Sequence, residues 1–340
     1  MNIAAYSIAR LLDNGMDYGD AWRLHARVEQ GAAWIETAQA LGEENLARAE
    51  KTLARGRRAT ARDAFRYAAM CFRFAQAEIV EDTDRKRALY RRLIDAFAQS
   101  ARLDDPPTEK LSIAYRGAAL SGWLVRPAAA QAPVVFVFGG ADAWRETYWI
   151  SARYLVERGL AAFLVDLPGQ GEARLFGRAY TTPDSHLALS AMADVFPERS
   201  LGLWGNSLGG YFAARAAATD ARFAACCVNG GSARPAELLE RFPAFIEKFR
   251  AMAGATDERS ARAVFSALAL EEAVRCPVLV LHGMRDRIFL LPGAREIHDR
   301  AASADRTLRV WEDGEHCLYN YAHEKHCLVA DWFAERLLPT

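Results

Sequence analysis

Over about the first 105 residues, apolar side chains recur at three- and four-residue intervals, which is the spacing of amphipathic helices. Phe65, Phe72 and Ile79 lie along one side of such a helix, and Phe74 lies on another side. A helix that is apolar on several sides is usually packed between neighbouring helices. The pattern therefore predicts an N-terminal all-helical domain over residues 1–105.

Polar residues mark the positions where these helices are expected to begin. Thr60 and Asp63 are spaced as in a capping box, and Asp20 is a candidate cap for an earlier helix. The helical domain is expected to end at residues 104–108, because the two prolines there cannot continue a helix. Two interpretations of this domain stay open: a bundle that only packs against the second domain, or a cap domain that roofs an active site and selects the substrate.

Beyond this boundary the pattern changes to short apolar runs that alternate with helical stretches. Val134–Phe138 and Val278–Leu281 are apolar at every position, as expected of strands buried on both faces of a parallel sheet. The strand candidates are Leu111–Tyr115, Leu120–Val125, Val134–Phe138, Ala161–Val165, Leu201–Trp204, Phe223–Val228, Val278–Leu281 and Leu308–Trp311. No helix separates the first two, which should form an antiparallel edge. Residues 106–340 are therefore expected to form an α/β domain with a mostly parallel eight-stranded sheet covered by helices.

Charge and composition narrow the possible partners. Lys and Arg together number 43, as do Asp and Glu, and 51% of the residues are hydrophobic. Nucleic acids and anionic membranes favour a basic excess, so neither is an expected partner, and a small-molecule substrate is expected instead. The N-terminus has no signal-peptide pattern and no apolar run is as long as a membrane span, which predicts a cytoplasmic protein.

The cysteines and histidines give no metal pattern. The six cysteines include no CxxC pair, and we expect buried free thiols in a reducing compartment. Histidines and cysteines gather near the C-terminus, but their spacing matches no zinc site. No metal is expected.

The strongest chemical motif follows the strand candidate Leu201–Trp204. Gly205-Asn-Ser-Leu-Gly209 is a G-x-S-x-G sequence with a strand before it and an apolar helix after it. Such a strand-to-helix turn lifts the serine hydroxyl clear of the sheet, and its glycines avoid clashes on either side. Ser207 is therefore the candidate nucleophile. The N–H of Leu208 is a candidate oxyanion donor, because the turn directs it toward the reacting carbonyl.

Two later strands supply partners for this serine. Asp286 follows the strand candidate Val278–Leu281, and His316 follows the last strand, which gives the order Ser, Asp, His. His316 would take the proton of Ser207, and Asp286 would orient the imidazole. His282 is the rival base, because it lies directly at a strand end; a structural role is preferred for it.

Two glycine-containing loops follow other strands. Gly139-Gly140-Ala141-Asp142 occupies the place of the second oxyanion donor, for which we choose the Ala141 N–H with Gly140 as its neighbour. The loop from Asp166 to Glu172 lacks the third glycine of a dinucleotide fingerprint and has a proline where a helix should begin. No cofactor is therefore expected.

The combination of these motifs is more specific than any one of them. An N-terminal helical domain with Phe138-Gly-Gly-Ala-Asp142, Asp166-Leu-Pro-Gly-Gln-Gly-Glu172 and Gly205-Asn-Ser-Leu-Gly-Gly210 resembles the esterase-like family of the fermentation–respiration switch protein. This branch of the α/β hydrolases includes hydrolases of carbon–carbon bonds and polyketide-shortening hydrolases. The resemblance implies a helical cap and a homodimer. It also implies an extra acidic residue for carbon–carbon cleavage, for which Glu237 and Glu240 are candidates that no motif distinguishes.

The expected activity is therefore that of a serine hydrolase on a small-molecule carbonyl compound, either a ketone whose carbon–carbon bond is cut or an ester. An acyltransferase or cyclase would use the same acyl-enzyme with another acceptor. A regulatory protein that only binds a ligand is a third hypothesis, although a binding protein has no need for the complete set of nucleophile, base and orienting acid.

Overall fold

The computed structural model describes residues 6–129, 131–141 and 143–339. The chain divides into two compact units. The first ends at Glu109 and also includes Glu146–Ile150, and the second comprises Lys110–Arg145 and Ser151–Thr340. Among the described residues, no helix combines the length and the apolar character that crossing a membrane requires.

The first unit is helical. Its helices are α1 (Ile8–Asp13), α2 (Tyr18–Glu29), α3 (Trp34–Leu53), α4 (Arg58–Ala77) and α5 (Asp84–Ala101). The middle helix α4 packs against both α3 and α5, and its residues are buried on all sides over its second half. Gly42 allows α3 to approach α4 closely, because a Cβ at this position would lie 2.7 Å from the ring of Phe72.

Two predicted helix starts in this unit are wrong. Helix α2 begins at Tyr18 and is capped by Asp17, whereas Asp20 is a buried residue inside the helix. Asp20 instead accepts a hydrogen bond from Asn45 Nδ2 at 2.6 Å. Helix α4 begins before Thr60, so the expected capping box lies within the helix.

The second unit is built on one eight-stranded sheet. Its strands are β1 (Glu109–Tyr115), β2 (Ala118–Val125), β3 (Val134–Phe138), β4 (Ala161–Val165), β5 (Leu201–Asn206), β6 (Phe223–Asn229), β7 (Val278–Gly283) and β8 (Arg306–Trp311). Their order across the sheet is β1-β2-β4-β3-β5-β6-β7-β8. Strand β2 runs antiparallel to β4, and the pairs from β4 to β8 are parallel. The predicted fold class is confirmed.

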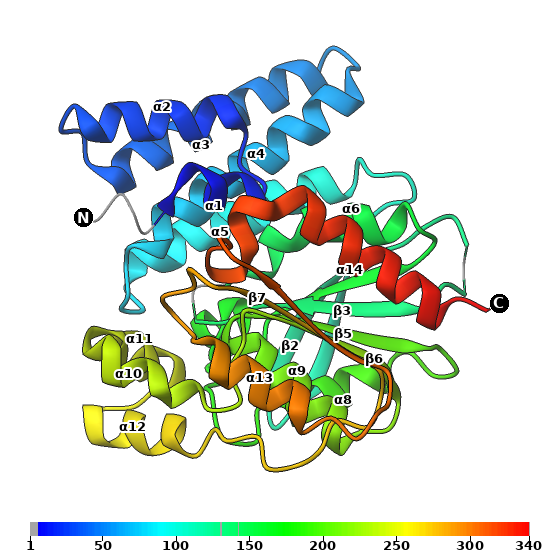
Figure 1. The fold of residues 1–340 in the computed structure, drawn as a ribbon. Helices are drawn as coiled ribbons and strands as arrows, with labels where there is room; N and C mark the ends of the chain where they lie inside the picture. Colours follow the sequence, from blue (N-terminus) through cyan, green and yellow to red (C-terminus); the bar gives the residue numbers. More distant parts are fainter. Residues whose placement is uncertain (1–5, 130, 142, 340) are drawn as a thin grey trace. The chain divides into compact units, whose positions relative to one another are not determined.

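Helices cover both faces of this sheet (Figure 1). Helices α6 (Trp149–Val156) and α14 (Ala322–Leu337) lie over one face, and α8 (Leu187–Ala193), α9 (Leu208–Thr219) and α13 (Leu291–Asp299) lie over the other. Strands β3, β4 and β7 are buried at every position, because helices exclude water from both of their faces. The carboxyl ends of the parallel strands therefore meet at one edge, where such sheets hold their functional residues.

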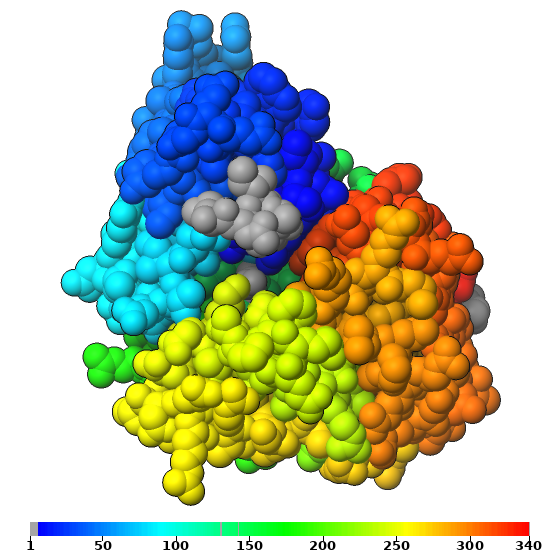
Figure 2. All heavy atoms as spheres, turned by 60° about the vertical axis from the view of Figure 1, so that its left-hand side comes forward, coloured from blue at the N-terminus to red at the C-terminus, as the bar shows by residue number. Residues whose placement is uncertain are grey.

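Shorter helices fill the connections. They are η2 (Arg145–Tyr148), α7 (Gly171–Leu175), η3 (Pro235–Glu237), α10 (Leu238–Arg241), η4 (Pro243–Phe245), α11 (Ile246–Ala253), α12 (Glu258–Ser266) and η5 (His316–Tyr321). The segment from α10 to α12 adjoins the segment that follows β7 on the face shown in Figure 2. Arg241 connects the two by donating from its guanidinium to the Ile288 carbonyl oxygen at 2.6 Å.

Candidate active site

Ser207 lies at a sharp turn between β5 and α9. Its backbone has φ +57°, a left-handed conformation that non-glycine residues rarely adopt. The Ser207 N–H donates to the Asn229 carbonyl oxygen at 2.9 Å, which ties the turn to the end of β6. A Cβ on Gly205 would lie 2.3 Å from the Gly209 carbonyl oxygen. A Cβ on Gly209 would lie 2.7 Å from the Gly139 carbonyl oxygen, so close approach of backbone requires both motif glycines.

The structure brings the three predicted polar side chains together. His316 Nε2 lies 2.9 Å from Ser207 Oγ, and His316 Nδ1 lies 2.8 Å from Asp286 Oδ2. The other carboxylate oxygen of Asp286 accepts the N–H groups of Ile288 and Phe289 at 2.8 and 3.1 Å. Asp286 is thus held by its own loop, and the predicted nucleophile, base and orienting carboxylate form one continuous hydrogen-bonded series.

Two opposing influences act on the pKa of His316. Burial lowers it, and the neighbouring groups Asp286 and, to a lesser extent, Cys317 raise it, with a net rise above the ordinary value. Asp286 thus favours the imidazolium that forms when the ring accepts a proton. The thiol of Cys317 is a further neighbour, with its Sγ 3.5 Å from His316 Nε2.

The rival base His282 lies at the end of β7 and is 1% exposed. Burial lowers its pKa, which keeps the ring neutral. The Ser207 hydroxyl shares its hydrogen bond with Nε2 of His316. The structure therefore supports the preference for His316 over His282 as the partner of the serine.

The glycine loop after β3 lies beside the serine. A Cβ on Gly140 would be 2.7 Å from the Leu208 nitrogen and 3.0 Å from Ser207 Oγ. Leu208 is the first residue of α9, where the N–H precedes any intrahelical acceptor. Ala141 follows at a partly exposed position, and Asp142 lies outside the described residues. The structure thus brings Gly140 and Leu208 to Ser207, and the oxyanion role of these residues and of Ala141 stays a prediction.

The loop after β4 carries three side chains whose contacts the sequence interpretation missed. The amide of Gln170 donates to the carbonyl oxygens of Gly139 and Gly140 at 2.6 and 3.0 Å. Asp166 accepts both the backbone N–H and the guanidinium of Arg145, at 3.0 and 3.2 Å. Glu172 accepts the same guanidinium at 2.5 Å. The loop rejected as a dinucleotide site therefore holds the glycine loop in place.

A second missed feature is a series of buried amides below the site. Asn206 Nδ2 donates to the Phe138 carbonyl oxygen at 3.1 Å, and Asn229 Nδ2 donates to Asn206 Oδ1 at 2.9 Å. Asn229 Nδ2 also donates to the Cys317 carbonyl oxygen at 3.0 Å, and Lys325 Nζ reaches the same oxygen at 3.2 Å. This series connects the ends of β3, β5 and β6 to the residue that follows His316.

The two acidic candidates have different surroundings. Glu240 is exposed on α10, whereas Glu237 is half-buried in η3. Burial raises the pKa of Glu237, although hydrogen bonding to Ser232 lowers it in part. A Cβ on Gly293 would lie 3.1 Å from Glu237 Oε1. Glu237 therefore faces the start of α13, and a role in proton transfer to carbon stays a hypothesis.

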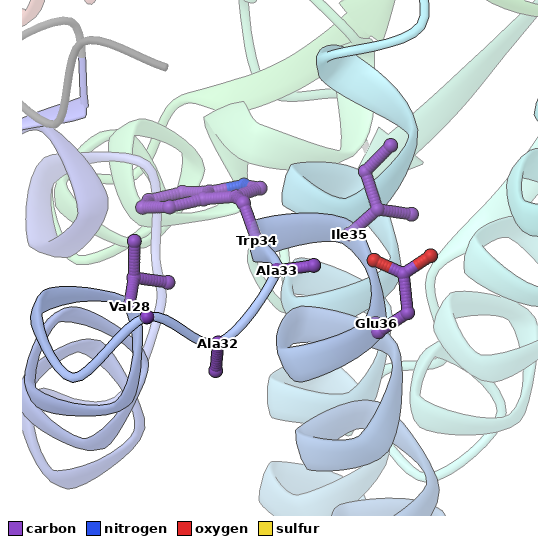
Figure 3. Close-up of a pocket in the computed structure, with 7 residues that line it drawn as sticks. Val28, Ala32, Ala33, Trp34, Ile35 and Glu36 are labelled. Carbon is purple, nitrogen blue, oxygen red and sulfur yellow. The ribbon is translucent and has the colours of Figure 1, made fainter.

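A surface pocket in the helical unit contains none of the expected catalytic groups. Its walls are Val28, Gly31, Ala32, Ala33, Trp34, Ile35 and Glu36 (Figure 3). The one ionisable side chain in that set, Glu36, pairs with Arg85 at 2.6 Å. With neither a nucleophile nor a base in its walls, this pocket is not the candidate active site.

The chain is similar to known hydrolases. Residues 34–235 match a family described as FrsA-like esterases, and residues 184–339 match the prolyl oligopeptidase family. The 2,6-dihydropseudooxynicotine hydrolase of Paenarthrobacter nicotinovorans is 26% identical over 258 residues, covering 73% of this chain and 70% of that protein. The α/β hydrolase ucsC of an Acremonium species is 36% identical over 164 residues, covering 41% of this chain and 33% of that protein.

Solved structures agree in fold. The crystal structure of the 2,6-dihydroxy-pseudo-oxynicotine hydrolase matches with a TM-score of 0.88 at 26% identity, covering 98% of this chain and 96% of that chain. AbyA5 matches with a TM-score of 0.65 at 18% identity, covering 86% and 92% of the two chains, which shows the fold alone.

Proposed function

Because the chain belongs to the FrsA-like esterase family of α/β hydrolases, we propose that it is a serine hydrolase acting on a small-molecule carbonyl compound. The observation that carries the proposal is the hydrogen-bonded series from Ser207 Oγ through His316 to Asp286, with distances of 2.9 and 2.8 Å. The bond that is cleaved is either an ester or a carbon–carbon bond next to a ketone.

In the first half of the reaction, Ser207 Oγ attacks the carbonyl carbon and its proton passes to His316 Nε2. The carbonyl oxygen becomes an oxyanion, held by the N–H groups of Leu208 and Ala141 with Gly140 beside them. Removing one such donor typically slows an enzyme by about 10²–10³-fold. Asp286 stabilises the imidazolium that this step creates.

In the second half, the tetrahedral intermediate collapses and its leaving group takes the proton from His316. An ester releases an alcohol, and a 1,3-diketone releases a carbanion equivalent that is protonated to a ketone. Water then attacks the acyl-enzyme, gives its proton to His316, and releases a carboxylic acid with Ser207 restored. One water is consumed per bond cleaved in either case.

The proposed range of substrates follows from relatives. The protein from Paenarthrobacter nicotinovorans is a hydrolase of a pseudooxynicotine compound by name, and the family description names esterases. We therefore propose neutral organic ketones or esters as substrates of this chain. A purely ligand-binding role is disfavoured, because a binding site has no use for a base hydrogen-bonded to a strained serine.

A fluorophosphonate probe tests the nucleophile. We expect it to label the folded wild-type protein and not Ser207→Ala, with Ser190→Ala as a labelled control that changes a serine remote in sequence from the motif. Labelling that persists in Ser207→Ala, or none in the wild type between pH 6 and 9, would contradict the proposal.

A substrate comparison then separates the reactions. Wild-type protein is incubated with p-nitrophenyl acetate and, separately, with a 1-aryl-1,3-butanedione, and products are identified by mass spectrometry. A carboxylic acid with a methyl ketone from the diketone identifies carbon–carbon cleavage, and turnover of the ester alone identifies an esterase. Adding a primary amine reveals acyl transfer if an amide replaces the carboxylic acid.

A further inference from the structure

Both the oxygen and the nitrogen of the Gln170 side chain are hydrogen-bonded, although Gln170 is not one of the three predicted triad residues. Gln170 is 3% exposed and is the residue that precedes α7. Its Oε1 accepts the Leu167 N–H at 2.9 Å, and its Nε2 donates to the carbonyl oxygens of Gly139 and Gly140 at 2.6 and 3.0 Å. One buried amide therefore fixes two successive carbonyl groups of the loop after β3.

The direction of these carbonyl groups determines the direction of two N–H groups. In a trans peptide, the C=O of one residue and the N–H of the next lie in one plane and point in opposite directions. Holding the Gly139 C=O toward Gln170 turns the Gly140 N–H away from it, and holding the Gly140 C=O turns the Ala141 N–H away. Successive N–H groups that point to one side form a concave anion-binding surface.

The other side of this loop faces the nucleophile. The Cβ position of Gly140 lies 2.7 Å from the Leu208 nitrogen and 3.0 Å from Ser207 Oγ. The backbone at Gly140 thus separates the Gln170 amide from the region where an oxyanion would form. Gly140 also lacks the side chain that would fill this space.

We propose that Gln170 is a positioning residue that orients the N–H groups of Gly140 and Ala141 toward the oxyanion; this rests on the proposed hydrolase function. The side-chain hydrogen bonds of Gln170 go to the backbone of Leu167, Gly139 and Gly140, so it acts through the loop backbone. A glutamine suits the position, because an amide supplies both the donor for the carbonyl groups and the acceptor for the Leu167 N–H.

The loop that carries Gln170 is itself held to the segment that it positions. Asp166 accepts the Arg145 N–H and guanidinium at 3.0 and 3.2 Å, and it also accepts the Glu172 N–H at 3.3 Å. The glycine loop is therefore fixed in its middle by Gln170 and at its far end by Asp166. Loss of the Gln170 amide should loosen the middle, where the Gly140 carbonyl oxygen still accepts the Ala143 N–H at 3.2 Å, while the end stays in place.

The test compares Gln170→Met with the wild type in p-nitrophenyl acetate hydrolysis. Methionine keeps the length and removes both hydrogen-bonding groups. We expect kcat to fall about 10- to 100-fold while KM stays within about twofold, because an oxyanion donor acts in the transition state rather than in substrate binding. Gln170→Glu keeps the acceptor and loses the donor, so its kcat should fall by a similar factor. This variant replaces Gln170→Met in the test if Gln170→Met does not fold.

A second measurement detects the oxyanion site directly. An aryl trifluoromethyl ketone adds to Ser207 Oγ to give a hemiketal whose oxygen titrates, and its pKa can be followed by ¹⁹F NMR. Misplaced N–H groups stabilise the anion less, so the hemiketal pKa should rise in Gln170→Met. A merely structural loss of packing has no reason to change this titration.

The matched control is Thr181→Val, which removes another buried hydrogen bond of the same loop, from Thr181 Oγ1 to the Pro168 carbonyl oxygen at 2.9 Å. The kcat of Thr181→Val should stay within about twofold of the wild-type value. If the wild type hydrolyses the ester and Gln170→Met keeps both kcat and the hemiketal titration, the positioning role is wrong and the hydrolase function stands. If the wild type hydrolyses neither the ester nor the 1,3-diketone and does not add the trifluoromethyl ketone, both proposals fall.

Discussion

Asn229 donates a hydrogen bond from Nδ2 to the carbonyl oxygen of Cys317 at 3.0 Å, across 88 positions of the chain. Cys317 follows the proposed base His316, and it has φ +53°, in the left-handed region. The same Asn229 accepts the Ser207 N–H at its own carbonyl oxygen at 2.9 Å. One buried residue therefore holds the backbone of both the proposed nucleophile and the loop of its base.

Replacing Asn229 with leucine tests this double attachment. Asn229 is 0% exposed, so Asn229→Leu leaves the Asn206 Oδ1 and Cys317 carbonyl groups without this buried donor. We expect the free energy of unfolding to fall by about 1–3 kcal/mol, measured in urea, and kcat for p-nitrophenyl acetate to fall with it.

The control for this substitution is Asn320→Leu in the same histidine loop. Asn320 is exposed, and its amide bonds to the Glu315 N–H and the Asp313 carbonyl oxygen, both at 2.9 Å. Water can replace these partners, so the free energy of unfolding should fall by less than about 1 kcal/mol. Equal losses for the two variants would show that burial of Asn229 has no special effect.

The pH dependence of activity should report on Asp286. His316 accepts a proton only when neutral, so kcat/KM falls as pH drops through its pKa. Burial lowers that pKa and Asp286 raises it to a net value above the ordinary 6.5. Asp286→Asn removes the largest raising influence and leaves burial and the smaller raising influence of Cys317, so the midpoint of the acidic limb should move to lower pH. The rate above the midpoint should fall strongly as well, because the imidazole loses its orienting partner.

The matched control for the pH experiment is Glu315→Gln, an exposed carboxylate beside the histidine. Solvent screens its charge, so the midpoint should stay where it is in the wild type. Profiles of kcat/KM between pH 5 and 10 provide the comparison. A midpoint that is the same in Asp286→Asn as in the wild type would contradict the role of Asp286.

Two cations pair with Glu172, and they should contribute unequally to stability. The side chain of Arg145 is 0% exposed and also pairs with Asp166, which is 1% exposed. Arg145→Met leaves a buried carboxylate uncompensated, and breaking a buried pair in this way typically lowers stability by about 3–5 kcal/mol. Lys110 binds the same Glu172 at 2.8 Å with 35% of its side chain exposed. Lys110→Met should lower stability by less than about 1 kcal/mol in urea unfolding.

The strands and the serine turn could be predicted because their signals are local. Strands such as Val134–Phe138 are apolar throughout, and only burial on both faces explains this pattern in a short segment. The turn at Ser207 is encoded by glycines within two positions of the serine. The chain order Ser, Asp, His then gave a definite expectation for His316 and Asp286, which the structure places within hydrogen-bond distance of one another.

The residues that hold the site in place could not be found in the same way. Gln170 is 30 positions from the Gly140 carbonyl that it binds, and no spacing rule relates a glutamine to a distant backbone oxygen. Asp20 illustrates the reverse error. Its type suits a helix cap, but in the core it accepts a hydrogen bond from Asn45 Nδ2 at 2.6 Å, and Asp17 three positions earlier caps the helix. Tertiary contacts decide between two positions that are locally equivalent.

Adding a single methyl group to the serine turn should disable it. A Cβ at Gly205 would lie 2.3 Å from the Gly209 carbonyl oxygen, and backbone cannot move aside as a flexible side chain can. We expect Gly205→Ala to lower the free energy of unfolding by about 1–3 kcal/mol through overpacking. Fluorophosphonate labelling of Ser207 should fall by more than the unfolded fraction of the variant accounts for. The matched control is Gly19→Ala, where the new methyl meets only the carboxylate oxygen of Asp17 at 3.0 Å. That variant should keep wild-type labelling and unfold at a similar urea concentration. If Gly205→Ala labels at the wild-type rate, the geometry of the turn tolerates a side chain, and the strained serine at φ +57° is not what makes Ser207 reactive.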